Sequence, residues 1–377
     1  MSKPRRNGDL YIGLMSGTSL DGVDGVLADF SGGNLKVLAH CSAPMPEPLR
    51  AELLALNTPG DNELHRAALA GNALARVYAS VVASLLADAK IQGHQISAIG
   101  AHGQTVRHRP QEFDGTGYTL QLNQPALLAE LCQIPVVADF RSRDVAAGGQ
   151  GAPLVPPFHA AVFAQTTQSV AVLNMGGISN ITLLPATGLG EVSGYDCGPG
   201  NALMDAWCQQ HTGQAYDNGG RWAASGQLVP QLLQTMLQEP FFSKAPPKST
   251  GRDLFNRAWL DQQLAKVGDA TPVDVQATLT ELTALACAQA AQRTGWGQGR
   301  LLACGGGALN THLMTRLTAA LPGWTVGSTE QRGLPPLQVE AAAFAWLARQ
   351  TCMGAEASLP KVTGARGARI LGCVYPA

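Results

Sequence analysis

The chain of 377 residues is long enough for two domains with substantial cores, and its 45% hydrophobic content indicates a globular rather than a disordered protein. Its net charge is −1 without long runs of Lys or Arg, which argues against nucleic acid as a main partner. The eight cysteines form no CxxC pair and no apolar run approaches a membrane span, so we expect free thiols in a soluble cytoplasmic protein with no membrane partner.

The first predicted feature is a β-hairpin with a polar turn. An apolar strand begins at Leu10 and runs into MSGTSLDG, and the chain then returns as a second strand, GVLADF. Glycine lets a ligand approach the main chain, and Ser16, Thr18 and Ser19 add donors, so the turn could surround a phosphate; an ordinary hairpin turn is the alternative. Asp21 within this turn favours a cation beside the phosphate, and capping of the turn is its alternative role.

After the hairpin, the first half of the chain alternates strands with helices. Its second half repeats the scheme from a second hairpin, whose turn is again rich in Gly and Asn. In the first half we expect a strand at 34–45, a helix at 63–90, a buried strand at 96–106, a helix at 124–133, a strand at 134–140 and a polar loop at 141–153. In the second half we expect a hairpin at 170–184, strands near 189–195, 300–304 and 324–329, helices at 202–213, 277–293, 311–321 and 340–350, and a strand-like run at 368–375.

Three antiparallel strands followed by alternating helices and strands, present twice, predict an α/β protein with mixed sheets covered by helices. Residues 216–274 are richer in Pro, Gly and Trp and are predicted to form an insertion or a lid-like region.

Glycine-rich loops follow three of the predicted strands. The turn with Asn174, Gly176 and Gly177 corresponds in position to the first hairpin turn. A third cluster, CGGGALN at 304–310, precedes a helix, where unpaired amides and the helix dipole favour an anion. Each loop alone could be a structural turn, but together they favour a nucleotide site.

The two halves, each with one predicted phosphate hairpin, resemble the actin-like ATPase superfamily, which has a two-lobed, ribonuclease H-like fold. Within it, seven motifs that span nearly the whole chain resemble those of the anhydro-N-acetylmuramic acid kinases. The family pattern DTGPGN is DCGPGN here, because Cys197 replaces the threonine. The matching motifs are MSGTSLDGVD at 15–24, AHGQT at 101–105, VADFRSRDVAAGGQGAPL at 137–154, NMGGISNIT at 174–182, DCGPGN at 196–201, CGGGALN at 304–310 and the segment 330–346.

The resemblance implies an N-terminal lobe at 1–140, joined by 350–377, and a C-terminal lobe at 141–349, with a central cleft. It also implies a reaction in which the anhydro sugar, ATP and water give N-acetylmuramate 6-phosphate and ADP during cell-wall recycling. A homodimer is what the family suggests. The alternatives are an actin-like ATPase with a chaperone or regulatory role, a kinase for another small sugar, and a serine hydrolase that uses SGTS but lacks GxSxG.

For the nucleotide, the resemblance implies contacts from two hairpin turns and the third glycine cluster, with Mg²⁺ held by Asp21 through water. The implied phosphate contacts are Ser16, Gly17, Thr18, Ser19, Leu20, Asp21, Gly22 and Val23, with Asn174, Gly176 and Gly177 on the second turn. The implied contacts near the nucleoside are Gly305, Gly306, Gly307 and Asn310.

Asp196 is the candidate base, since it ends a strand before a glycine loop and a helix. The 6-oxygen of an anhydro sugar carries no proton, so this carboxylate would deprotonate a water that attacks the anomeric carbon, and the released 6-oxygen would take the phosphoryl group. A helix N-cap role is the alternative for Asp196.

For the sugar, Arg141 and Arg143 could pair with the lactyl carboxylate, since a guanidinium fork matches a carboxylate. Salt bridges with Asp139 or Asp144 are the alternative. His102 could hydrogen-bond the sugar, although a single strand-end histidine is often structural. The resemblance suggests that Glu340 meets sugar hydroxyls, whereas a first-turn acid could also complement the helix dipole. Cys197 and Cys304 are interpreted as packing residues.

Overall fold

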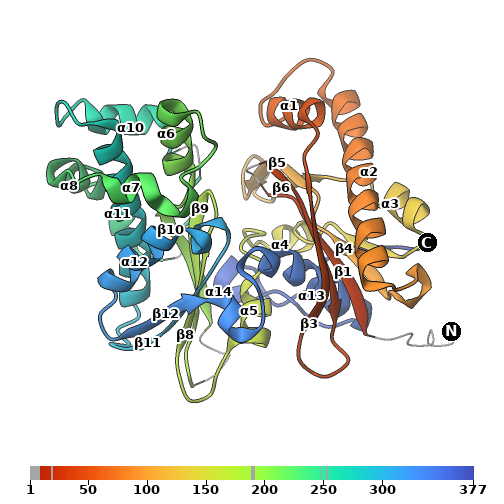
Figure 1. Cartoon of the computed structure of the whole chain (residues 1–377). Coiled ribbons are helices and arrows are strands. Elements are labelled where there is room, and N and C mark those ends of the chain that lie inside the picture. Colours follow the sequence, from red (N-terminus) through yellow and green to blue (C-terminus); the bar gives the residue numbers. More distant parts are fainter. Residues whose placement is uncertain (1–8, 18–19, 188–191, 247, 252–253) are drawn as a thin grey trace. The chain divides into compact units, whose positions relative to one another are not determined.

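The computed structural model describes residues 9–377 except 18–19, 188–191, 247 and 252–253 (Figure 1). The chain separates into two compact units, which are described in turn. Unit 1 comprises the chain up to Val162 together with Gln338–Ala377, and unit 2 comprises Phe163–Leu337. Residues 141–162 and 338–349, which the resemblance assigned to the C-terminal lobe, therefore belong to unit 1 by their packing.

The main sheet of unit 1 begins with the predicted antiparallel meander. Strands β1, β2 and β3 pair in sequence, β4 and β7 extend the sheet parallel to β1, and β13 closes it antiparallel to β7. Within the described residues the order is β13-β7-β4-β1-β2-β3. The bounds are β1 Leu10–Met15, β2 Gly22–Asp29, β3 Lys36–Pro44, β4 Ala98–Ala101, β7 Val136–Ala138 and β13 Cys373–Tyr375.

The two faces of this sheet are covered by helices, which explains why β1 is buried along most of its length. On one face lies α2 (Glu63–Ala89), and on the other lies the alanine-rich α13 (Val339–Met353). A Cβ on Gly13 would lie 1.8 Å from the Ala341 carbonyl oxygen, and one on Gly100 would lie 2.1 Å from that of Phe344. Glycine in β1 and β4 thus permits the close approach that joins α13 to unit 1.

The predicted strand at 96–106 is wrong in one respect. The chain turns at Gly103, where φ is +79°, and the residues beyond it leave the main sheet. They form β5 (Gln104–Pro110), which pairs with β6 (Gly117–Leu122) in a separate two-stranded sheet. The remaining helices of unit 1 are α1 Glu47–Ala55, α3 Pro125–Cys132, α4 Ser142–Ala146, α14 Pro360–Thr363 and the short η1 Gly93–Gln95; α5 Pro156–Phe163 lies where the two units join.

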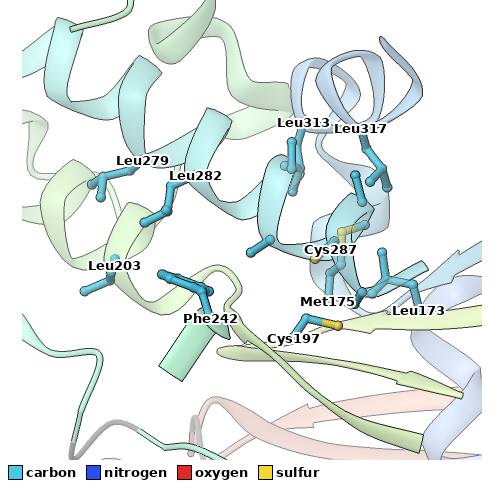
Figure 2. Packing of buried hydrophobic residues seen from close by; sticks show 14 of the residues in the cluster. Leu173, Met175, Cys197, Leu203, Phe242, Leu279, Leu282, Cys287, Leu313 and Leu317 are labelled. Carbon is cyan, nitrogen blue, oxygen red and sulfur yellow. The ribbon is translucent and has the colours of Figure 1, made fainter. Parts of the chain in front are cut away.

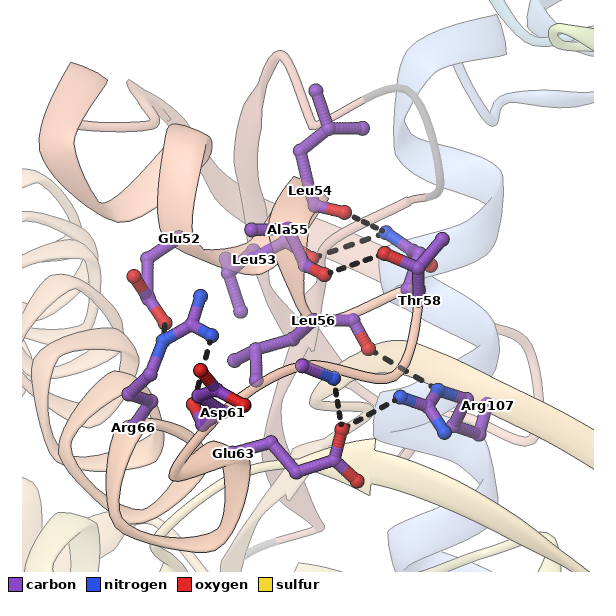
Figure 3. Close-up of polar contacts among 12 residues, drawn as sticks. Glu52, Leu53, Leu54, Ala55, Leu56, Thr58, Asp61, Glu63, Arg66 and Arg107 are labelled. Atoms are coloured by element: carbon purple, nitrogen blue, oxygen red, sulfur yellow. Dashed lines mark hydrogen bonds and ion pairs between the residues drawn. The ribbon is translucent and has the colours of Figure 1, made fainter.

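Arg107 attaches the small sheet to its neighbours by an ion pair to α2 and a hydrogen bond to the residue after α1, and a second ion pair joins α1 to α2. Figure 3 shows Arg107 on β5 donating to Glu63 on α2 at 3.1 Å and to the Leu56 carbonyl oxygen at 3.2 Å. Arg66 on α2 donates to Glu52 on α1 at 2.7 Å. These contacts hold the segment that follows His102 against α1 and α2.

Helix α2 is long and apolar enough to cross a membrane by length and composition, contrary to the expectation from the sequence. Its buried residues, which include Leu74, Tyr78, Val81 and Leu85, instead pack against β2 and β3 and belong to the core of unit 1. Burial in the core of unit 1 is therefore sufficient to explain the apolar composition of α2.

The sheet of unit 2 repeats the plan of unit 1, as the sequence predicts. Strands β8, β9 and β10 form an antiparallel meander, and β11 and β12 continue it in parallel from β8. The order within the described residues is β10-β9-β8-β11-β12. The bounds are β8 Val170–Met175, β9 Ile178–Leu184, β10 Ser193–Pro199, β11 Gly299–Cys304 and β12 Trp324–Ser328. The predicted α/β class with mixed, helix-covered sheets is confirmed in both units.

The core of unit 2 is organised by the long helix α11 (Pro272–Gln292), which begins at the N-cap Thr271. Figure 2 shows Leu279, Leu282 and Cys287 of α11 in one cluster with Leu313 of α12 and Met175 of β8. The other helices are α6 Ala202–Thr212, α7 Arg221–Ser225, α8 Pro230–Leu237, α9 Pro240–Ser243, α10 Arg257–Leu264 and α12 Thr311–Ala320, with short turns η3 Asn218–Gly220, η4 Gly306–Leu309, η5 Thr329–Arg332 and η6 Pro336–Gln338.

The region 216–274 contributes to this same core. Its helices bury Leu232, Met236, Phe242 and Trp259 in the cluster around α11. The region thus has a packing role in unit 2, whatever further role it has as an insertion.

Candidate functional site

In unit 1, three predicted site residues follow the ends of neighbouring parallel strands, the usual position of ligand sites in α/β sheets. Ser16 follows β1, His102 follows β4 and Arg141 lies just beyond β7. His102 Nδ1 lies 3.2 Å from the Ser16 carbonyl oxygen, and Arg141 Nη2 lies 2.9 Å from His102 Nε2. Arg141 Nη1 also donates to the Gly151 carbonyl oxygen at 2.8 Å. The structure therefore joins residues that the sequence predicts separately.

Burial determines the charge of the histidine in this network. His102 is 5% exposed and its ring lies 4.7 Å from that of Phe344. Burial, aided by the charge of Arg141, lowers the pKa of His102 to about 3. The ring is neutral at physiological pH, so Nε2 accepts from Arg141 and Nδ1 carries the proton that is donated to Ser16.

The guanidinium of Arg141 is itself withdrawn from water. Burial lowers its pKa to about 10, and the nearby charges of Glu340 and Asp144 oppose this shift. Glu340 lies in the first turn of α13 and so stands within electrostatic reach of Arg141. The group remains charged at neutral pH, which suits a partly buried site for an anion.

The alternative role of Arg141 and Arg143, a salt bridge with a neighbouring Asp, is not supported by the carboxylate contacts. Asp144 is fully buried and accepts from the Gly151 amide at 2.8 Å and from Thr363 Oγ1 at 2.8 Å. Asp139 accepts from Ser142 Oγ at 2.5 Å. Arg143 is exposed on α4.

Around the first hairpin turn, Gln104 has a role that the sequence analysis did not predict. Ser16 Oγ donates to Gln104 Oε1, and Gln104 Nε2 donates to the Gly17 carbonyl oxygen at 3.1 Å. The only signal for Gln104 in the sequence was a polar residue two positions after His102 in a strand predicted to be buried. Both predicted donors Thr18 and Ser19 lie outside the described residues.

Three further residues of this turn, Leu20, Gly22 and Val23, have packing roles, whereas Asp21 does not. Leu20 is buried with φ +59°, and Val23 is buried in the core. A Cβ on Gly22 would lie 2.4 Å from the Ala43 carbonyl oxygen, so glycine is needed for pairing with β3. Asp21 is exposed, and its carbonyl oxygen accepts from the Met45 amide at 3.1 Å.

An exposed carboxylate fits Mg²⁺ that keeps most of its water, since this ion prefers oxygen ligands and loses water reluctantly. No group of three or more metal-ligating side chains occurs in the described part of the chain, so a cage made of protein ligands is not available there.

In unit 2, the motifs NMGGISN, DCGPGN and CGGGALN converge. The Gly200 amide donates to the Gly177 carbonyl oxygen at 3.0 Å, and the Asn201 amide donates to that of Gly176 at 2.8 Å. A Cβ on Gly305 would lie 2.5 Å from Asn174 Oδ1. The turn of β8 and β9, the loop after β10 and the loop after β11 therefore form one surface.

Two buried polar atoms at this surface have no protein partner among the described residues. They are Asn174 Oδ1 and Ser179 Oγ, on either side of the β8–β9 turn. Buried polar atoms are nearly always hydrogen-bonded, so this pair fits a polar ligand or water at the turn. Sequence reasoning missed Ser179, whose only signal is its place within NMGGISN.

The third glycine cluster does not lead directly into a helix N-terminus. Gly306 and Gly307 begin the short turn η4, and α12 starts only at Thr311. Asn310 is the N-cap of α12, because its Oδ1 accepts from the Leu313 amide at 3.0 Å. One amide at the start of α12, that of Leu313, is thus taken by the cap, and Cβ atoms on Gly306 and Gly307 would lie nearest to Asn201 and Met175.

Asp196 lies on β10, immediately before a bulge in the pairing with β9. Its Oδ2 accepts from the Thr250 amide at 2.9 Å, and its own amide donates to the Lys248 carbonyl oxygen at 3.1 Å. Burial raises the pKa of Asp196 to about 6, although the Thr250 hydrogen bond and the charge of Lys248 lower it. Asn201 occupies the N-cap position of α6, so the alternative role of Asp196 as that cap is wrong.

Lys248 and Thr250 were not found from the sequence, because more than fifty residues separate them from Asp196. Lys248 Nζ donates to the Phe241 carbonyl oxygen at 3.1 Å and lies 4.4 Å from the centre of the Phe241 aromatic ring. The neighbouring Cys197 is buried, and burial next to Cys287 raises the pKa of its thiol. Cys304 is buried as well. A protonated Cys197 thiol in a core agrees with a packing role.

Comparison with known proteins gives a consistent result along the whole chain. A family model described as anhydro-N-acetylmuramic acid kinase matches residues 9–377. A curated protein of that name from Variovorax paradoxus (strain S110) is 66% identical over 373 residues, which cover 98% of this chain and 100% of the relative. One from Bordetella pertussis (strain Tohama I) is 58% identical over 373 residues and covers 98% and 97%.

Solved structures align at low identity. The activator of the 2-hydroxyisocaproyl-CoA dehydratase from Clostridium difficile with bound ADPNP aligns with TM-score 0.46 and 12% identity, over 91% of this chain and 96% of the other. A ROK family glucokinase from Streptomyces griseus in complex with glucose and AMPPNP aligns with TM-score 0.40 and 13% identity, over 90% and 99%.

Proposed function

The chain belongs to the anhydro-N-acetylmuramic acid kinase family, and we propose that it performs this family's reaction with Asp196 as the base. Water attacks the anomeric carbon of the anhydro sugar and gives its proton to Asp196. The bond between that carbon and the 6-oxygen breaks, and the 6-oxygen takes the γ-phosphoryl group of ATP. The products are N-acetylmuramate 6-phosphate and ADP, which places the enzyme in the recycling of cell-wall sugars.

The observation that carries the assignment is the environment of Asp196. A general base works best when its pKa lies near the working pH, and burial raises that of Asp196 to about 6. The Thr250 amide holds one carboxylate oxygen, which fixes the orientation of the group. Its second oxygen has no contact assigned to it in the described structure, and we propose that this atom receives the proton of the attacking water.

We propose that the converging glycine motifs of unit 2 bind the nucleotide. Gly176, Gly177 and Asn174 would contact phosphate through N–H groups, while the unpartnered Asn174 Oδ1, an acceptor, would suit a hydroxyl group of the ligand or a water. Gly305, Gly306 and Gly307 would lie near the nucleoside, and Asn310 would act through the cap of α12. In unit 1, the turn from Ser16 to Val23 remains the first predicted phosphate segment.

Mg²⁺ would be held by Asp21 through water and would neutralise phosphate charge. Positioning and charge neutralisation are the main demands of phosphoryl transfer, so a turn that offers main-chain groups and one exposed carboxylate is sufficient for this part of the chemistry.

For the sugar, we propose that Arg141 binds the lactyl carboxylate and that Glu340 meets hydroxyl groups. The contacts of Arg141 with His102 and Gly151 use three of the five guanidinium N–H groups, so donors remain for a carboxylate. Arg143 is exposed and stays a candidate for the same anion. The cytoplasmic location and the homodimer also stay predictions.

The decisive test compares wild type with Asp196→Asn. We expect the variant to lose roughly 10²–10⁴-fold in kcat with ATP affinity largely retained, because a general base contributes about that much. Substantial residual turnover would remove Asp196 from its role. In ¹⁸O-labelled water the label should appear on the anomeric hydroxyl, whereas label in phosphate would indicate plain ATP hydrolysis.

A substrate series tests the activity itself. The relatives are named as kinases for this sugar, so a chaperone role is not favoured. ATP turnover should depend on anhydro-N-acetylmuramic acid and be far weaker with N-acetylmuramic acid or glucose. Sugar-independent turnover stimulated by a protein would favour the chaperone alternative.

A further inference from the structure

We propose that His102 is a positioning residue that joins the sugar-binding arginine to the first phosphate turn, with one ring nitrogen for each. This inference rests on the proposed function, because it takes Arg141 as a sugar contact and the Ser16 turn as a phosphate segment. It differs from the expectation that His102 itself hydrogen-bonds the sugar. All the residues involved belong to unit 1.

The geometry leaves His102 no unused ring nitrogen. Nδ1 lies 3.2 Å from the Ser16 carbonyl oxygen, while Nε2 lies 2.9 Å from Arg141 Nη2 and 3.2 Å from Nε. The Phe344 ring packs against the imidazole at 4.7 Å. A sugar hydroxyl would have to displace one of these protein contacts to reach the ring.

Only one protonation state satisfies both contacts. Arg141 has donors and no acceptor, so Nε2 must be unprotonated, and the Ser16 carbonyl oxygen is an acceptor, so Nδ1 must carry hydrogen. The low pKa of His102 agrees with this neutral form. The directions of both hydrogen bonds are thus fixed: His102 Nε2 accepts from Arg141, and Nδ1 donates to the Ser16 carbonyl oxygen.

Each end of the junction is also held by a separate contact. Ser16 Oγ donates to Gln104, and Arg141 Nη1 donates to the Gly151 carbonyl oxygen at 2.8 Å. The Gly151 amide in turn donates to the buried Asp144 at 2.8 Å. Loss of the histidine would therefore loosen the link between the two ends while leaving each end attached to the fold.

The functional consequence is coupling between the two substrates. A carboxylate on Arg141 polarises the guanidinium and with it the hydrogen bonds through His102 to the Ser16 turn. Because binding linkage is reciprocal, ATP and the sugar should each raise the affinity for the other by the same factor. Removing either half of the junction should reduce this factor toward one.

Two substitutions separate the halves. His102→Asn places an amide near the position of Nδ1, so it keeps a donor for Ser16 and loses the acceptor for Arg141. His102→Gln reaches the position of Nε2, so it keeps the acceptor and loses the donor. We expect about tenfold weaker sugar binding in His102→Asn with ATP binding within about twofold, and the reverse pattern in His102→Gln, from the roughly 1.4 kcal/mol that one hydrogen bond supplies.

The measurements are KM and calorimetric Kd for the sugar and for a non-hydrolysable ATP analogue, each with and without the other ligand. His65→Asn and His65→Gln on the exposed face of α2 are matched controls and should change none of these constants. Weakening of sugar binding alone, and to the same extent, in both His102 variants would overturn the junction and restore a direct sugar contact.

A second readout does not depend on the variants' folding. In ¹⁵N-labelled wild type, the His102 imidazole should show a protonated Nδ1 and an unprotonated Nε2 from pH 5 to 9. The opposite tautomer would overturn the proposal. If Arg141→Met leaves sugar affinity unchanged, the proposed sugar site fails; if Arg141→Met weakens it and the two His102 variants show no split, only the junction fails.

Discussion

The two units use the same strand plan but hold their hairpin turns by different means. In unit 1 the turn after β1 is held by side chains, with Gln104 on Ser16 and Gly17 and His102 on the Ser16 carbonyl oxygen. In unit 2 the turn after β8 is held by the main chain, because the amides of Gly200 and Asn201 donate to its carbonyl oxygens. The first arrangement is sensitive to hydrogen-bonding groups and the second to the mere presence of a Cβ.

The two units also treat buried ionisable groups differently. His102 in unit 1 is kept neutral by burial beside Arg141, which suits a group that only positions others. Asp196 in unit 2 has a pKa raised to about 6, within reach of working pH, which suits a group that exchanges a proton. In the roles proposed above, unit 1 therefore supplies a histidine that positions other groups, and unit 2 supplies the carboxylate that exchanges a proton.

The largest effect is expected where unit 1 does depend on glycine, beneath α13. A Cβ on Gly13 would meet the Ala341 carbonyl oxygen at 1.8 Å, so Gly13→Ala must displace the helix. We expect it to destabilise the protein by roughly 3 kcal/mol, the upper end for overpacking, as measured by urea unfolding. Gly32→Ala is the control, since nothing lies within 4 Å of its Cβ. Equal stability of the two variants would mean that α13 does not pack on β1 in this way.

That packing also marks a limit of what the sequence could predict. The repeated meander is visible as local alternation of apolar residues, and the meeting of NMGGISN, DCGPGN and CGGGALN follows once their strands are neighbours. The return of α13 to unit 1 depends instead on the space above Gly13 and Gly100. Such complementarity between distant segments leaves no periodic signal in either of them.

The candidate site also combines residues that the sequence reveals with contacts that it does not reveal. His102 and Arg141 are recognisable because they follow strand ends, where α/β proteins place functional groups. Asp196 was expected to end a strand, but it lies within β10 beside the bulge, and its recognisable signal is the glycine loop that follows. The contacts that set their chemistry come from elsewhere. Thr250 reaches Asp196 across a long separation in sequence, and the break at Gly103 that frees β5 depends on a positive φ within an apolar run.

A matched pair of glycines tests the turn of unit 2. A Cβ on Gly176 would meet only the Ile178 carbonyl oxygen at 3.7 Å, whereas one on Gly200 would lie 2.2 Å from the Gly176 carbonyl oxygen. Gly176→Ala should keep wild-type stability and raise KM for ATP by roughly tenfold, because the added methyl group would hold a phosphate away from the Gly176 amide and weaken that charge-assisted hydrogen bond. Gly200→Ala should lose about 2 kcal/mol of stability as well.

Steady-state kinetics with ATP and urea unfolding of both variants distinguish these outcomes. An unchanged KM for ATP in a stable Gly176→Ala would contradict the phosphate assignment. A stable Gly200→Ala would contradict the account of the turn as held by close main-chain contact.

The pH dependence of the free energy of unfolding tests whether burial of the ionised Asp196 carboxylate destabilises the folded state. Its folded pKa of about 6 lies above its ordinary value, so the folded state binds the proton more tightly than the unfolded chain does. Stability from this group is full below about pH 4, falls as pH rises through 6, and is constant above. Asn resembles the protonated form, so Asp196→Asn should match wild type at pH 4 and exceed it by about 1–3 kcal/mol at pH 8.

Urea unfolding of wild type and Asp196→Asn at both pH values measures this difference. His102 has the opposite sign, because its folded pKa is lowered and its contribution to stability is lost as pH falls below about 6.5. The comparison of variant with wild type at each pH removes this common background. A variant that is less stable at pH 8 would contradict the raised pKa.

The smallest expected effect concerns how the charge of Lys248 changes the pKa of the proposed base, Asp196. The charge of Lys248 lowers the pKa of Asp196 against the effect of burial, so Lys248→Met should raise it further. If Asp196 must be ionised to act, the acidic limb of kcat/KM, expected near pH 6, should move upward by about half a unit in this variant. Lys244→Met, whose side chain is exposed, is the matched control and should leave the limb in place. An acidic limb that moves downward or stays fixed in Lys248→Met would show that this limb reports a group other than Asp196. The distinction between a reactive unit 2 and a positioning unit 1 would then lose its main support.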